Sequence, residues 1–152
     1  MTSYGRTRTS WVDRTALGGQ DPLLLLARLL LGLIFVQSGF GKLINIAGFA
    51  AGLAGQGLPF PTLLAVVGAA VECFGGLAVV LGAWTRLAAA AVAVFTIAAT
   101  LVAHRYWEHP PEAQAMQRIQ FMKNLAIIGG FLALIAAGPG RFSLDAWMAR
   151  RR

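Results

Sequence analysis

Two charged side chains lie inside stretches of sequence that are otherwise almost entirely apolar. Glu72 is near the middle of the segment 62–84, and Arg28 is in the segment 23–44. Each segment is long enough to cross a bilayer as a helix, because about 20 residues with a rise of about 1.5 Å each span the hydrocarbon core. A charged group at that depth is costly unless it is paired or faces water. The sequence therefore predicts a buried polar site within the membrane.

We expect Arg28 and Glu72 to form this site as an ion pair between two antiparallel helices. Glycines share the broad helix face of Glu72, where small residues let a neighbouring backbone approach closely: Gly68, Gly75, Gly76 and Gly82. Two interpretations stay open. The pair only fixes the packing of the helices, or it forms a functional polar site, which is the usual role of charges within a membrane.

A second set of polar side chains is expected near the other end of the spans, on the outward side. It consists of Gln37, Lys42, Thr100, His104, Gln120, Lys123 and Asn124. Such groups can hydrogen-bond a quinone carbonyl or bind an anion at the membrane interface. The alternative is that the cations only extend to the interface and the other side chains anchor the helix ends. We regard the set as a candidate contact for a quinone or a lipid headgroup.

Metal binding is a weaker interpretation of the segment 104–112. The spacing of His104, Glu108, His109 and Glu112 matches no common ligand motif, and the prolines at 110 and 111 interrupt the helix that would align these side chains. The two histidines of the chain also lie at one membrane edge, which argues against a haem with two axial histidines. We therefore expect no metal site in this chain.

The overall composition predicts an all-α integral membrane protein, a four-helix bundle with short interfacial segments. Of 152 residues, 57% are hydrophobic and only 12% are charged, which is typical of a protein with several membrane spans. The spans are expected at about 23–44, 62–84, 87–103 and 125–137. The glycine- and proline-rich segment 45–61 is too broken for a spanning helix and is expected to be interfacial or re-entrant.

The expected organisation along the chain has three parts. A cytoplasmic tail covers 1–21, a four-span membrane domain covers 22–145, and a basic tail covers 146–152. Pro22 is expected in the first turn of the first helix, where its missing N–H would have no partner in any case. The polar stretch 112–124 is expected to lead into the fourth span.

The net charge of +7 does not indicate a nucleic-acid partner, because the basic residues cluster at both termini and at the ends of apolar segments. Eight arginines lie in the two tails and in the turns beside them: Arg6, Arg8, Arg14, Arg86, Arg141, Arg150, Arg151 and Arg152. The preference for positive charge on the cytoplasmic side predicts both termini in the cytoplasm and a location in the bacterial inner membrane. The lone Cys73 cannot form a disulfide within the chain.

Three stretches of the sequence resemble the DoxX family of small four-span bacterial membrane proteins. They are RLLLGLIFVQSGFGKL from Arg28, GAAVECFGGLAVVLGAWTR around Glu72, and FMKNLAIIGGFLALIAAGPGRFSLD near the C-terminus. The resemblance covers 23–145 and implies a four-helix membrane bundle that associates with other proteins. By motif match it also implies the polar positions of the family: Arg28, Glu72, Lys123, Asn124, Ser143 and Asp145.

Members of that family are described as subunits of thiosulfate:quinone oxidoreductase, as partners in membrane redox or oxidative-stress complexes, or as proteins of unknown role. The resemblance therefore implies a membrane subunit of a redox complex, linked to quinone, with the redox cofactor carried by a partner and none in this chain. A non-catalytic scaffold or assembly factor, or a small transporter that uses the Glu72 face, is the alternative. The expected partners are the lipid bilayer and either a different protein or a second copy of the chain.

Overall fold

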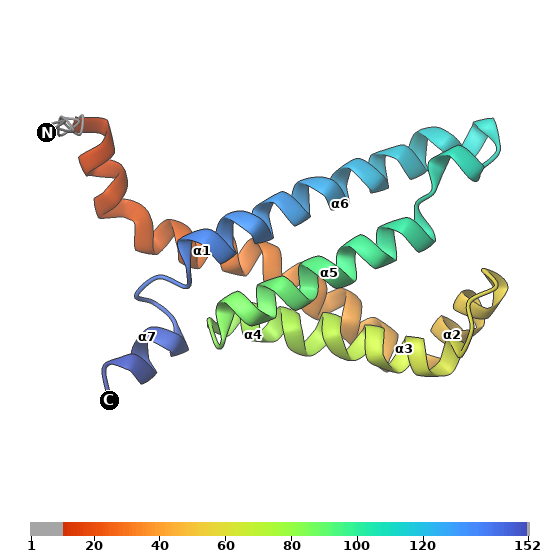
Figure 1. Cartoon of the computed structure of the whole chain (residues 1–152), viewed down its shortest axis with the longest axis horizontal. Coiled ribbons are helices and arrows are strands. Elements are labelled where there is room, and N and C mark those ends of the chain that lie inside the picture. Colours follow the sequence, from red (N-terminus) through yellow and green to blue (C-terminus); the bar gives the residue numbers. More distant parts are fainter. Residues whose placement is uncertain (1–10, 152) are drawn as a thin grey trace, which may run out of the picture.

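The protein is described here by a computed structural model that covers residues 11–151, with the backbone alone for 11–18. Within that range the chain is helical and has no strands (Figure 1). The long helices are α1 (Trp11–Leu43), α5 (Thr85–Ala103) and α6 (Pro111–Ala137), and the shorter ones are α2 (Ile46–Gly55), α3 (Pro61–Ala70), α4 (Gly76–Leu81) and α7 (Leu144–Ala149). A π-helical turn, Val71–Gly75, joins α3 to α4, and a single 3-10 turn, Tyr106–Glu108, follows α5.

The described residues contain four helical stretches long and apolar enough to cross a membrane. They are Gly19–Leu43, Pro61–Leu81, Thr85–Glu108 and Pro111–Ala137. Large apolar side chains such as Leu30, Leu87 and Leu132 are exposed on their outer faces, as expected where a helix contacts lipid. The predicted all-α membrane bundle with four spans is confirmed.

The first helix differs from the prediction. It begins at Trp11, so Pro22 lies inside it and not in its first turn. A proline within a helix removes one backbone hydrogen bond and crowds the preceding turn, which bends the helix axis. Figure 1 shows the N-terminal part of α1 turned away from the rest of this helix. Of the expected N-terminal tail, residues 1–10 lie outside the described part of the chain.

The fourth helix also begins earlier than predicted, because Pro111 opens α6 and the polar stretch 112–124 continues the same helix into the span. Proline is well tolerated at a first helical position, since the N–H that it lacks has no intrahelical partner there. The segment 45–61 contains the short helix α2, separate from the spans. Asn45 caps α2 by accepting a hydrogen bond from Gly48 N at 3.1 Å. That α2 lies in the membrane interface stays a prediction.

Close packing between α1 and the second span aligns the polar residues described below. A Cβ atom added at Gly39 would lie 2.3 Å from Cys73 N, and one added at Gly76 would lie 2.9 Å from Gly32 O. Only glycine permits such an approach of two helix backbones. Beside this contact, the core contains Phe35, Val79, Val92, Phe131 and Leu134, with the rings of Phe35 and Phe131 5.5 Å apart.

Candidate functional site

The two intramembrane charges are both buried, but they lie in different places. Arg28 has no exposed surface and Glu72 is 5% exposed. Arg28 Nη1 donates to Val80 O at 3.4 Å, and Val80 is about two helical turns beyond Glu72. The prediction of an Arg28–Glu72 ion pair is therefore wrong. The packed glycines of the two helices place Lys42, in the last turn of α1, beside Glu72 instead.

Arg28 belongs to a cluster that joins the C-terminal segment to the bundle. Its Nη2 donates to Phe142 O, just before α7, and its charge attracts the Asp145 carboxylate. Gly82 leaves the room for the guanidinium, because a Cβ at this position would overlap Arg28 Nη1. Arg28 Nε is the one fully buried side-chain nitrogen or oxygen atom without a hydrogen-bond partner among the described residues.

Asp145 completes this cluster from the first turn of α7. Its carboxylate accepts hydrogen bonds from Trp84 N at 2.7 Å, from Thr85 N at 2.9 Å and from Thr85 Oγ1 at 2.8 Å. Its own N–H donates to Gly82 O at 2.9 Å. Burial raises the pKa of Asp145, but the hydrogen bonds from Thr85 and Trp84, together with the charge of Arg28, outweigh it and leave the pKa below its ordinary value.

Ser143 and Asp145, two polar positions implied by the family resemblance, thus make their hydrogen bonds within the chain. Ser143 Oγ caps α7 by accepting from Ala146 N at 3.1 Å, and it donates to Gly140 O at 2.6 Å. We call Arg28, Thr85, Ser143 and Asp145 the C-terminal clasp. Every polar group of the clasp named above, apart from Arg28 Nε, has a hydrogen-bond partner within the chain. The bonds of Asp145 fasten α7 to the turn between α4 and α5 and to the first residue of α5.

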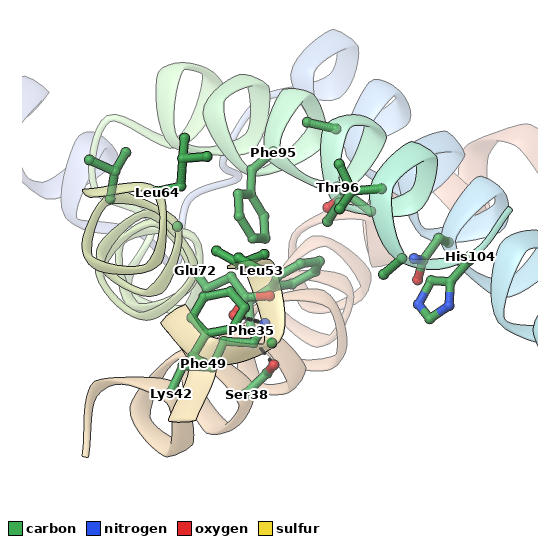
Figure 2. Close-up of a pocket in the computed structure, with 18 of the residues that line it drawn as sticks. Phe35, Ser38, Lys42, Phe49, Leu53, Leu64, Glu72, Phe95, Thr96 and His104 are labelled. Carbon is green, nitrogen blue, oxygen red and sulfur yellow. Dashed lines mark hydrogen bonds and ion pairs between the residues drawn. The ribbon is translucent and has the colours of Figure 1, made fainter. Parts of the chain in front are cut away.

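Glu72 lies on a cavity of about 630 Å³ between α1, α2, the second span, α5 and α6. The walls are mainly apolar, with Phe35, Phe49, Leu53, Leu64 and Phe95 among the lining residues (Figure 2). Polar side chains approach it from two sides. One side has Ser38, Lys42 and Glu72, and the other has His104, Lys123 and Asn124. We call it the Glu72 cavity.

At the first side, Lys42 and Glu72 form an ion pair in which Nζ and Oε2 are 2.5 Å apart. Ser38 Oγ donates to the same oxygen at 3.4 Å. The Lys42 ammonium also lies 5.0 Å from the ring centre of Phe49 and 5.8 Å from that of Phe95, distances typical of cation–π contacts. Figure 2 shows Lys42, Ser38 and Glu72 converging at one side of the cavity, with His104 apart from them.

The backbone around Glu72 is unusual for a spanning helix. The π-helical turn Val71–Gly75 widens the helix at the residue that carries the charge. Single π-turns inside α-helices occur often at functional sites, because they displace a side chain from its regular position at a cost in local stability. The apolar sequence around Glu72 gave no signal for this turn.

At the second side, the polar groups are linked in pairs. Asn124 Nδ2 donates to Thr100 Oγ1 at 2.9 Å, and that hydroxyl donates to Thr96 O at 2.6 Å. His104 Nδ1 lies 2.8 Å from Gln117 Oε1. Lys123 lines the cavity while remaining exposed.

Only some of the predicted quinone or headgroup contacts lie at the cavity. Lys42, His104, Lys123 and Asn124 line one cavity, and Thr100 contacts Asn124 from behind. Gln37 is exposed on α1 and does not line the cavity, nor does Gln120. The structure also joins Glu72 to this set, which the prediction had kept separate.

The lining side chains that sequence reasoning missed include Ser38, Phe49 and Phe95. A signal existed for Ser38, which lies four residues before Lys42 and so shares its helix face. The two phenylalanines carry no such signal, because apolar residues in a spanning sequence look the same whether they face lipid or a cavity.

The candidate metal ligands of the segment 104–112 do not form a cluster. Within 19–151, where side chains are described, no group of three or more His, Cys, Asp or Glu side chains is placed to bind a metal ion. Glu108 pairs with Arg105 at 3.1 Å, and His104 contacts Gln117.

Four apolar helices long enough to span a membrane define a polytopic α-helical membrane protein, with the clasp at one end and a mainly apolar cavity at the other. The sequence model of the DoxX family matches residues 23–105, more than half of the chain. The chain belongs to the DoxX family.

Two curated relatives support this assignment. The chain is 37% identical to inner membrane protein YphA of Escherichia coli over 81% of its own length and 88% of the relative. It is 36% identical to inner membrane protein YqjF of the same organism, over 83% of its own length and 92% of the relative. Together with the four apolar helices, these relatives indicate a multi-pass protein of the inner membrane.

A more distant relative is the uncharacterized membrane protein Rv3486 of Mycobacterium tuberculosis. It is 27% identical over 99% of this chain and 96% of the relative. No solved structure matches the chain.

Proposed function

We propose that this protein is the membrane subunit of a redox complex and that it binds a quinone headgroup in the Glu72 cavity. The electron-carrying cofactor belongs to a partner protein in this proposal. The sequence has one cysteine and two histidines, too few to ligate an iron–sulfur cluster. Both termini face the cytoplasm, in line with the arginines of the two tails.

The observation that carries the proposal is the character of the cavity. Sites for lipophilic ligands usually measure about 300–1,000 Å³ and have apolar walls with a few convergent polar groups. The Glu72 cavity measures about 630 Å³ and has aromatic and aliphatic walls. The ring and isoprenoid carbons of a quinone suit such walls, and its two oxygens need a few polar partners.

The polar side chains that line the cavity supply hydrogen-bond partners for the quinone oxygens. Lys123 and Asn124 present N–H donors to the second side of the cavity, and the ion pair of Lys42 with Glu72 lies at the first. A bound quinone would supply the capacity to carry electrons and protons. The side chains of this chain would bind the headgroup, orient it and exclude water from it.

A test compares two substitutions of alanine by phenylalanine. Ala99 lines the cavity, whereas Ala126 is exposed on α6 and does not line it. We expect Ala99→Phe to abolish binding of a radiolabelled short-chain ubiquinone to the protein in nanodiscs, and Ala126→Phe to leave it unchanged. Absence of binding by the wild-type protein would overturn the proposal and favour a scaffold or a transport role. The partner is tested separately: gentle extraction of the native complex followed by mass spectrometry should identify a co-purifying redox protein.

A further inference from the structure

We infer that the Glu72 cavity prefers the hydroxyl-bearing, reduced form of its ligand, a quinol, and that Glu72 Oε1 accepts the hydrogen bond of its hydroxyl group. This inference rests on the proposed quinone site and adds to it which redox form is bound more tightly and which atom discriminates. It concerns binding alone and needs no electron-transfer step.

The two oxygens of Glu72 are used unequally. Both the Lys42 ammonium and the Ser38 hydroxyl bind Oε2. In the part of the chain with described side chains, Oε1 accepts no hydrogen bond. It is also not among the fully buried atoms without a partner, which there are limited to Arg28 Nε. Since Glu72 lines the cavity and is 5% exposed, the surface left to Oε1 is that of the cavity.

The chemistry of this oxygen decides what can bind beside it. A carboxylate paired with an ammonium only accepts hydrogen bonds. A ligand group against Oε1 must therefore donate, as a hydroxyl does. A quinone carbonyl has only lone pairs, and placing it there would bring two acceptors together in an apolar cavity, where such contacts are costly.

Lys42 does not remove this conflict easily. Its ammonium is engaged with Glu72 Oε2 and lies against the rings of Phe49 and Phe95. To serve a carbonyl at the position beside Oε1, it would have to leave these contacts. The other side of the cavity does not discriminate in this way, because the Lys123 ammonium and the Asn124 amide can donate to a carbonyl oxygen or to a hydroxyl oxygen alike. The preference is therefore set at Glu72.

The experiment measures competitive binding of decylubiquinol and decylubiquinone to the full-length protein in nanodiscs without oxygen. We expect the quinol to bind about tenfold tighter, the effect of one discriminating hydrogen bond to a charged acceptor. Glu72→Gln should bring the ratio close to one, because an amide donates as well as accepts. Gln37→Ala should keep the wild-type ratio, since this side chain is exposed on α1 and does not line the cavity.

A second measurement avoids dependence on a variant that fails to fold. Infrared difference spectra of the wild-type protein should show a shift of a carboxylate stretching band when quinol binds, and none when quinone binds. Equal binding of the two forms, tighter binding of quinone, or the same infrared change with both would overturn the inference and leave the quinone site intact. Binding of neither form would overturn the proposed function itself.

Discussion

The C-terminal clasp and the Glu72 cavity both bury charged side chains, but they treat them in opposite ways. In the clasp, Asp145 accepts three hydrogen bonds from Trp84 and Thr85 at the start of α5, and Arg28 binds the backbone just before α7. At the cavity, both described hydrogen bonds of Glu72 are made to Oε2, and Oε1 accepts none. Apart from Arg28 Nε, the clasp is a closed network, and the cavity is an open one.

This difference separates two uses of charge within a membrane protein. A network such as the clasp, in which all buried polar groups but Arg28 Nε have partners within the chain, stabilises the fold. A charged group with spare hydrogen-bonding capacity on an apolar cavity can recognise a ligand. Loss of a clasp residue should therefore reduce stability, whereas loss of a cavity residue should mainly reduce binding.

The largest effect is expected from Arg28→Ala. The substitution leaves Phe142 O without its donor and Asp145 without its nearby positive charge, and it opens a cavity in the interior. Removing one partner from a buried charged network typically costs about 3–5 kcal/mol. We expect a free energy of unfolding lower by that amount, measured by chemical unfolding in detergent. Arg118→Ala, at an exposed position of α6, should change it by less than about 0.5 kcal/mol.

The next largest effect is expected from Asp145→Asn. An amide oxygen cannot accept all three of the hydrogen bonds that the two carboxylate oxygens accept from Trp84 and Thr85, and the attraction of Arg28 is lost. A hydrogen bond to a charged group typically contributes about 1.5–3 kcal/mol to the free energy of unfolding. We expect a loss within this range, with quinone binding unchanged. Lost binding with intact stability would mean that the two regions are not independent.

Substitutions in the Glu72 cavity should reduce ligand binding and leave stability nearly unchanged, in contrast to those in the clasp. Replacing both members of its ion pair, Lys42→Met with Glu72→Leu, removes a half-buried and a buried charge together, which is often close to neutral for stability. We expect the double variant to unfold within about 1 kcal/mol of the wild type while ligand binding is lost. Thermal unfolding and a binding assay on the same sample would check this. A double variant that binds normally would show that the charges are dispensable for the site.

The smallest effect is expected in the pH dependence of stability. The pKa of Asp145 in the folded protein lies below its ordinary value, so its contribution to stability is present above that ordinary value, about 4. It is lost as the pH falls from there through the lower folded value. Stability of the wild type should therefore decline below pH of about 4, and this part of the decline should be absent in Asp145→Asn. Unfolding curves at several pH values measure the difference, and parallel declines would contradict it.

The helical architecture was predictable because membrane-spanning sequences are long and apolar, and the four spans follow from length and hydropathy alone. The boundaries were less predictable. Pro22 and Pro111 both suit a first helical turn, yet the chain uses only Pro111 in this way. Local preference cannot decide this, because a long helix can include a proline by bending when its other residues favour the helix.

The site was predictable in its parts but not in its pairing. Arg28, Lys42 and Glu72 stand out as charges in apolar sequence, but their partners depend on the offset between two helices. That offset is set by backbone contacts at Gly39 and Gly76, and the sequence marks many glycines as possible contact points. The Phe142 carbonyl bound by Arg28 could not have been predicted at all, since it belongs to a turn far away along the chain.

The most direct test of the account is photochemical labelling with a quinone that carries a photoreactive group near its ring. The protein is labelled in native membranes, and the modified residues are identified by mass spectrometry. We expect labels on residues that line the Glu72 cavity, such as Phe49, Leu53 and Phe95, and their loss in Ala99→Phe. Labels that concentrate on the C-terminal clasp or on the lipid-facing sides of the helices, and that persist in Ala99→Phe, would contradict the assignment of the open network to ligand binding.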